Sequence, residues 1–122
     1  MKKQNPRTDA PALKPRLRIT SGKSIAFGPG KAELLGLVSE TGSISQAASR
    51  MGMSYMRAWS LVQTMNTCFK QPVIAAVRGG KDRGGARLTK AGEQVLKLYR
   101  RMEKKCLRAV QTDWRALQAI LR

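Results

Sequence analysis

The hydrophobic pattern of the chain begins with a short alternating segment. Residues 17–20 and 24–27 alternate around Ser21-Gly22, which predicts a β-hairpin. Beyond Gly28 the spacing becomes helical, with an apolar stripe at Leu34, Leu35, Leu37 and Val38. Proline suits the first position of a helix, and glycine commonly follows its end. We therefore expect a helix that opens at Pro29 or Lys31 and stops at Gly42.

Two short helices joined by a tight turn are predicted from Thr41 to Cys68. Ser45 offers a side-chain oxygen as N-cap of the first helix, and Gly52 ends it because glycine adopts the left-handed conformation without steric cost. Ser54 caps the second helix, expected over residues 54–68. The small pair Ala47-Ala48 lets the two helices cross closely. This is the pattern of a helix-turn-helix, whose second helix lies in the DNA major groove.

A hairpin is predicted directly after these helices. Val73–Val77, apolar and partly β-branched, suits a short strand, and a glycine-rich basic segment over 78–87 leads to Leu88. Glycines supply the positive φ angles of a hairpin tip, and lysine and arginine meet phosphate. The order indicates the wing of a winged helix, in contact with the DNA backbone or minor groove. A nucleotide-binding loop is disfavoured, because Gly-x-x-x-x-Gly-Lys-Ser/Thr is absent.

The last part of the chain predicts one long helix, about 89–121, capped by Thr89. From Val95 its apolar residues recur every three or four positions over roughly 30 residues, hence about 45 Å. This stripe extends beyond a winged-helix core that ends near Met102, so another surface is needed to bury the apolar residues that follow. A second copy of the chain is the simplest supplier, and docking onto the helix at 29–41 is the alternative. The expected dimerisation residues are Met102, Cys106, Val110, Trp114, Leu117 and Leu121.

The net charge of the chain indicates what kind of partner it binds. The 122 residues suit one domain and include 24 basic and 7 acidic side chains, a net charge of +17. So basic a chain is expected to bind a polyanion: DNA, RNA or an acidic membrane surface. Residues 1–15, with three prolines and few apolar side chains, are expected to form a disordered basic arm. Residues 16–122 would then be the winged helix-turn-helix domain with its C-terminal dimerisation helix.

The candidate DNA contacts lie on the predicted second helix and the wing. Ala58, Val62 and Met65 should face the core, which leaves Met56, Ser60, Gln63 and Thr67 on the opposite face. The N-terminal half of a recognition helix reaches base edges, so the base-reading candidates are Tyr55, Met56, Arg57, Trp59 and Ser60. Packing of Trp59 beneath the wing is the alternative for that residue. The phosphate-contacting candidates are Ser45, Ser54, Gln63, Thr64, Arg78, Lys81, Arg83 and Arg87.

Catalytic and metal-binding chemistry has little support in the sequence. There is no histidine, and Cys68 and Cys106 are far apart and lack metal-ligand spacing. We expect both to be buried small apolar residues in a reducing compartment. Without paired carboxylates nothing supplies a general base, so we expect no enzyme, metal site or cofactor. With no membrane-length apolar run and no signal-peptide pattern, we expect a cytoplasmic protein on the nucleoid, without a membrane partner.

Several short segments carry a resemblance to a known family. They are Ser43-Ile-Ser-Gln-Ala-Ala, Met53-Ser-Tyr, Ala58-Trp59, Met65-Asn66, Gly79-Gly-Lys, Gly84-Gly-Ala and Leu88-Thr-Lys-Ala-Gly. Together, over roughly residues 16–110, they closely resemble the DNA-binding half of the ModE family of molybdate-responsive transcription regulators. The helix-turn-helix is also similar, more distantly, to that of LysR-type regulators, whose wing lacks this glycine pattern. In the ModE family separate, following domains bind molybdate. Because this chain stops at Arg122, the resemblance implies no molybdate binding by this chain alone.

The fold class expected is mainly α with a small β wing: a winged helix-turn-helix followed by a long C-terminal helix. The function expected is that of a homodimeric, sequence-specific regulator of transcription that binds double-stranded operator DNA, with the molybdenum theme that the resemblance implies. A sequence-tolerant nucleoid-associated protein is the alternative, which the high charge would also suit. The ratio of specific to random DNA affinity separates the two.

Overall fold

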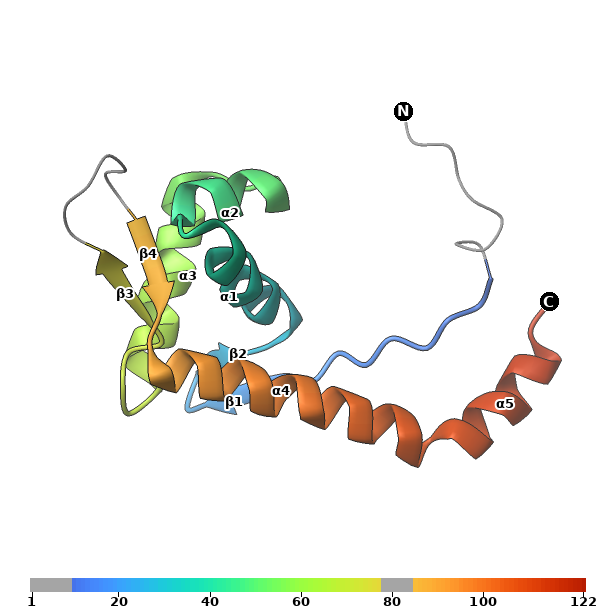
Figure 1. The fold of residues 1–122 in the computed structure, drawn as a ribbon. Helices are drawn as coiled ribbons and strands as arrows, with labels where there is room; N and C mark the ends of the chain where they lie inside the picture. The colour runs from blue at the N-terminus through green and yellow to red at the C-terminus, as the bar shows by residue number, and fades with distance from the viewer. Residues whose placement is uncertain (1–9, 78–84) are drawn as a thin grey trace.

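The computed structural model describes residues 10–77 and 85–122. Over these ranges the chain forms a winged helix-turn-helix followed by two further helices (Figure 1). The elements are β1 (Ile19–Ser21), β2 (Ser24–Phe27), α1 (Pro29–Thr41), α2 (Ile44–Met51), α3 (Tyr55–Cys68), β3 (Ile74–Val77), β4 (Gly85–Leu88), α4 (Lys90–Ala109) and α5 (Gln111–Ile120). The strands form two separate antiparallel hairpins. The mainly α fold with a small β wing is confirmed.

The first hairpin and helix follow the hydrophobic pattern. Gly22 adopts a φ of 61° in the β1–β2 turn, a value that favours glycine. Helix α1 opens at Pro29, and Gly42 ends it with a φ of 69° and an N–H that donates to the carbonyl of Val38 (2.8 Å). Its buried residues include Leu34, Leu35 and Val38, so the predicted stripe faces the core. Residues 10–18 form neither helix nor strand, and the rest of the expected arm (1–9) lies outside the described residues.

An aromatic cluster joins α4 to the N-terminal part of the core. The Phe27 ring meets Tyr99 at 5.0 Å and Phe69 at 6.0 Å between centroids, both edge to face. The Tyr99 hydroxyl donates to the carbonyl of Leu17 (2.7 Å), so a nearly fully buried phenol has a partner. Burial, followed by the nearby Glu103 carboxylate, raises the pKa of Tyr99. The first half of the C-terminal stripe is therefore part of the domain's own core.

The start of α4 lies unusually close to the two residues that precede β3. The Thr89 hydroxyl accepts from the N–H of Gly92 (3.0 Å), which confirms Thr89 as N-cap, and donates to the carbonyl of Pro72 (2.5 Å). At Gly92 an added Cβ would lie 2.1 Å from the carbonyl oxygen of Val73. Only glycine fits there. The close approach fixes where α4 leaves the wing.

The prediction of one unbroken helix over about 89–121 is wrong. Val110 has φ −106° and ψ 11° and separates α4 from α5, which turns away from the α4 axis in Figure 1. The Gln111 side chain donates to the Leu107 carbonyl (3.2 Å), an acceptor that the backbone N–H of residue 111 would use in a continuous helix. The N–H of Trp114 then begins a new helix on the Val110 carbonyl (2.8 Å).

The cysteines also differ from expectation. Cys106 is exposed and Cys68 half-buried, because α4 extends beyond the domain core at residue 106 and Cys68 lies in the last turn of α3. The described residues contain no cluster of three or more histidine, cysteine, aspartate or glutamate side chains placed to hold a metal ion. In residues 10–77 and 85–122, none of the helices has both the length and the apolar character that a membrane crossing requires.

Candidate nucleic-acid interface

The helix-turn-helix formed by α2 and α3 has the predicted geometry except at the N-cap of α2. Ser43, and not Ser45, is the N-cap of α2: its hydroxyl accepts from the N–H of Gln46 (3.1 Å). Gly42 in the left-handed conformation and an isolated β-bridge from Ser43 to Gly85 hold Ser43 extended, as an N-cap must be. Ser45 is therefore an exposed residue within the first turn of α2, where its hydroxyl stays a candidate phosphate contact.

The end of α2 and the start of α3 follow the sequence prediction. Gly52 ends α2 with a φ of 69°, and the Ser54 hydroxyl accepts from the N–H of Arg57 (3.1 Å) as the N-cap of α3. Buried Ala47, Ala48 and Ala58 place no long side chain between the two helices, so α2 and α3 can cross closely. The buried side of α3 is Ala58, Val62 and Met65, as predicted.

The exposed surface of α3 near its N-terminus carries large apolar side chains, with Met56 opposite the buried residues and Tyr55 and Trp59 on the flank toward the wing. The exposed fractions are 70% for Met56, 46% for Tyr55 and 42% for Trp59. Arg57 and Ser60 are exposed as well, while Gln63 is exposed and Thr64 half-buried one turn further on. The structure thus brings all five base-reading candidates to the first two turns of one helix.

The wing is anchored to the helix-turn-helix by backbone hydrogen bonds. Strands β3 and β4 pair from Ile74 with Leu88 to Val77 with Gly85. The N–H of Ala86 donates to the carbonyl of Gly42 (2.9 Å), directly before the α2 cap. On β4, Ala86 and Leu88 are buried and Arg87 between them is exposed. The other wing candidates, Arg78, Lys81 and Arg83, lie outside the described residues.

Asn66, which the sequence pattern did not single out as functional, joins α3 to the first strand of the wing. Its side-chain oxygen accepts from the N–H groups of Val73 (2.8 Å) and Ile74 (3.3 Å), and its amide nitrogen donates to the carbonyl of Ile74 (3.2 Å). A half-buried amide in the last turns of α3 thereby satisfies the backbone at the start of β3. The sequence signal available was an asparagine a few residues before a proline and a strand.

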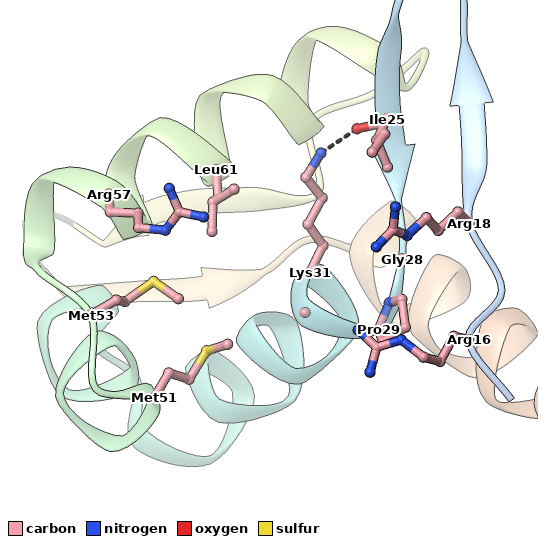
Figure 2. A pocket seen from close by; sticks show the side chains of 11 residues that line it. Arg16, Arg18, Ile25, Gly28, Pro29, Lys31, Met51, Met53, Arg57 and Leu61 are labelled. Atoms are coloured by element: carbon pink, nitrogen blue, oxygen red, sulfur yellow. Dashed lines mark hydrogen bonds between the residues drawn. The ribbon is translucent and has the colours of Figure 1, made fainter. Parts of the chain in front are cut away.

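Two hollows lie on the two flanks of α3. On the wing side a groove of about 220 Å3 is lined by Tyr55, Trp59 and Gln63 together with Ile74 and Ala76 of β3. Trp59 therefore lines this groove together with wing residues and is 42% exposed, and base reading by Trp59 stays a prediction. On the other flank Arg57 and Leu61 line a larger pocket with residues from the N-terminal part of the domain (Figure 2).

Comparison with known proteins places these features in a family. No protein-family model matches the chain. It is 46% identical over 77 residues to the molybdenum-pterin-binding protein MopB of Rhodobacter capsulatus, which covers 63% of this chain and 28% of that protein. It is 42% identical over 71 residues to the transcriptional regulator ModE of Yersinia pestis, covering 58% and 27%. With the molybdenum transport protein ModE of Herbaspirillum seropedicae the identity is 34% over 102 residues, covering 84% and 36%.

The fold has a counterpart among solved structures. The chain superposes on a structure described as the complex of the CbnR DNA-binding domain with DNA, with a TM-score of 0.55 and 20% identity, over 72% of this chain and 95% of that one. The likeness shows a fold of the LysR type. The chain itself spans only about a quarter to a third of the length of the three named relatives. Over that length it is a homologue of the ModE family of molybdate-responsive regulators, with a LysR-like winged helix-turn-helix.

Proposed function

We propose that this chain is a sequence-specific DNA-binding regulator of transcription that reads operator DNA with the N-terminal half of α3. The observation that carries the proposal is the exposed cluster Tyr55, Met56 and Trp59 beside Arg57, on a chain of net charge +17. Exposed apolar side chains gathered at one site commonly mark an interaction surface. In the major groove such side chains contact thymine methyl groups, and an arginine pairs with guanine.

The wing and the helix caps supply the backbone contacts in this proposal. Arg87 points to solvent from β4, and the wing is held to α2 through Gly42 and to α3 through Asn66. The hydroxyls of Ser45 and Ser54 lie in or next to the first turns of α2 and α3, where free amide groups favour an anion. Phosphate contacts of this kind fix the register of the protein on the duplex, while the α3 side chains carry the sequence preference.

Regulation connected with molybdenum is the finer part of the proposal. The relatives include proteins named as ModE transcriptional regulators and as molybdenum transport proteins. We expect the regulated genes of this chain to belong to the same metabolism. Genome-wide footprinting of the bound DNA tests this directly, because the genes beside the protected sites would show the regulon. Sites scattered without relation to molybdenum genes would contradict it.

We further propose that the chain acts as a homodimer through its C-terminal helices. In α5 no residue is buried, and apolar Leu117 and Ile120 are exposed to 51% and 79%. The expected dimerisation residues Met102, Cys106, Val110 and Leu121 are exposed too, and Trp114 is half-buried. Two copies would place two recognition helices on successive major grooves, with α4 and α5 setting the half-site spacing.

The decisive experiment is selection of binding sites from random duplexes, followed by measurement of affinity for the selected and for scrambled DNA. We expect a selected, pseudo-palindromic site that binds about 10³-fold or more tightly than random sequence at physiological salt. Equal affinity for all duplexes, with a steep salt dependence, would replace the proposal with that of a sequence-tolerant nucleoid protein.

A further inference from the structure

The flank of α3 that faces away from the wing carries a pocket without an assigned role. Its volume is about 380 Å3, and it lies between α3, the α2–α3 turn, the start of α1 and the segment that leads into β1. Figure 2 shows Arg57 on the α3 side, Arg16 and Arg18 on the opposite side, and the Lys31 side chain between them. These four cations come from three separate parts of the chain, and we call the hollow that they line the basic pocket.

No acidic side chain balances the positive charges that line the basic pocket, as far as the described residues show. Among its lining residues, all of which fall in the described ranges, none is acidic. The ion pairs found in the described part of the chain join Arg50 to Glu40 (3.8 Å) and Arg100 to Glu103 (3.2 Å), so neither draws on a cation of the pocket. Confined like charges repel one another, and an anion among them relieves that repulsion.

The start of α1 adds to the positive character of the same hollow. Its N-cap, Gly28, has no side chain to cap the helix, and no acidic residue lies in the first turn. The first intrahelical bond runs from the N–H of Ala32 to the Gly28 carbonyl, so the amides of Gly30 and Lys31 have no acceptor within the helix. The Lys31 ammonium donates to the carbonyl of Ile25, which holds this side chain across the pocket.

The position of the basic pocket beside α3 indicates which kind of anion it would bind. Successive helical residues are about 100° apart, so Arg57 lies roughly 200° around the helix from Trp59, which lines the wing-side groove. Exposed Met56 lies between the two flanks. A helix in the major groove has a sugar–phosphate backbone on each side of it. With α3 in the groove as proposed above, the wing on one flank would face one of these backbones and the basic pocket on the other flank would face the second.

We propose that the basic pocket binds a backbone phosphate of operator DNA, on the strand opposite the one that the wing contacts. The inference rests on the proposed DNA binding and extends it to Arg16, Arg18 and Lys31, which precede the helix-turn-helix. Arg16 and Arg18 are two residues apart in the segment that leads into β1, and both side chains line the pocket (Figure 2). They clamp the duplex from the flank that has no wing.

The test is the double substitution Arg16→Gln/Arg18→Gln in the full chain, with Lys97→Gln/Lys104→Gln on the exposed side of α4 as the matched removal of two charges. Affinity for the selected duplex is measured against salt concentration. Removal of one phosphate contact should lower the slope of log affinity against log salt by about 0.9 for each half-site, which corresponds to about eightfold in affinity per half-site at 0.1 M salt. Ethylation interference should lose one phosphate position per half-site in the pocket variant alone. Arg16→Lys/Arg18→Lys should restore most of the slope.

The outcomes separate the two proposals. Selective binding by the wild type, with equal slopes and interference patterns in the pocket and control variants, would overturn the phosphate site and leave the proposed function standing. Absence of selective binding by the wild type would overturn both. Titration with inorganic phosphate covers the remaining source: saturable binding that the pocket substitutions abolish without any change in DNA affinity would assign the pocket to a free oxyanion and overturn the DNA contact. An unchanged thermal midpoint of the variants confirms that they fold.

Discussion

At the scale of single residues, one missing side chain controls the junction between wing and α4. Gly92→Ala would place a methyl group 2.1 Å from the Val73 carbonyl oxygen, and both partners are backbone that cannot yield without moving a helix or a strand. We expect the free energy of unfolding to fall by about 2–3 kcal/mol or more. Chemical denaturation of the two proteins measures this.

Gly36→Ala is the matched control for that substitution. Gly36 lies within α1, and its added methyl would meet only the Arg100 guanidinium at 3.9 Å. Because alanine favours helix over glycine, stability should rise by about 0.5–1 kcal/mol. Equal effects of the two substitutions would contradict the close contact between α4 and β3.

Arg57 also lines the basic pocket, so its role in base reading is tested by the change in preference between duplexes, and Arg87 on the wing is the reference for backbone contact alone. Arg57→Ala should weaken binding to the selected operator by roughly 1–3 kcal/mol and relax the preference at one base pair. Arg87→Ala, on the exposed side of β4, should weaken all duplexes alike and reduce the salt slope by about one. Affinity measurements on operator and scrambled DNA at several salt concentrations check both. If Arg57→Ala acts as uniformly as Arg87→Ala, the recognition side of α3 has been misplaced.

Residues whose role is local could be predicted, and residues fixed by distant backbone could not. The capping bonds of Gly52, Ser54 and Thr89 join them to backbone within four residues of their own position, so their sequence context was sufficient to predict the caps. Ser43 and Ser45 both suit an N-cap, and the choice between them depends on a bridge to Gly85, some 40 residues away. The need for glycine at residue 92 arises from Val73 in the same way.

At the scale of elements, α3 and the wing behave as one unit because Asn66 joins them. Asn66→Ala would leave the N–H of Val73 and the backbone of Ile74 without their partner, at a cost of roughly 1–3 kcal/mol in stability. DNA affinity should fall as well, because the wing loses its fixed position relative to α3. Denaturation and affinity measurements on the same variant test both effects.

Thr67→Ala is the neighbouring control. The Thr67 hydroxyl is exposed and donates only to the Thr64 carbonyl within α3 (2.9 Å), so its removal should change stability by less than about 0.5 kcal/mol. An Asn66→Ala variant as stable as Thr67→Ala would show that β3 is held without the amide. Asn66→Asp keeps the acceptor and loses the donor, and should fall between the two.

The division between α4 and α5 shows where hydrophobic periodicity fails as a guide. Apolar residues recur every three or four positions in α4 and again in α5, and the pattern continues across Val110 without interruption. The sequence pattern therefore gives no sign of the break. Neither proline nor glycine occurs at the break, and Val110 changes direction through its own φ and ψ. The side chain of Gln111 replaces the missing backbone bond to Leu107, a compensation visible only in three dimensions.

At the scale of the whole molecule, a compact winged-helix domain carries an extended pair of helices that project from it (Figure 1). The domain core ends near Tyr99, and beyond it apolar side chains on α4 and α5 remain exposed. Burying a leucine contributes roughly 1.5–3 kcal/mol, so association of two copies is favoured. Repulsion between the many surrounding cations opposes it, but physiological salt screens exposed charges beyond about 8 Å. Burial should therefore outweigh repulsion.

Leu117→Glu tests this balance most directly. The full chain should sediment as a dimer at tens of micromolar, and Leu117→Glu, at the exposed apolar surface of α5, should shift it to monomer because a carboxylate would have to be buried in the interface. Ala119→Glu introduces the same charge at an exposed residue on the opposite side of α5 and should leave the dimer intact. The Leu117→Glu variant should keep its affinity for a single half-site and lose the tighter binding to two half-sites. A full chain that sediments as a monomer at this concentration would show that the apolar residues of α5 have another role.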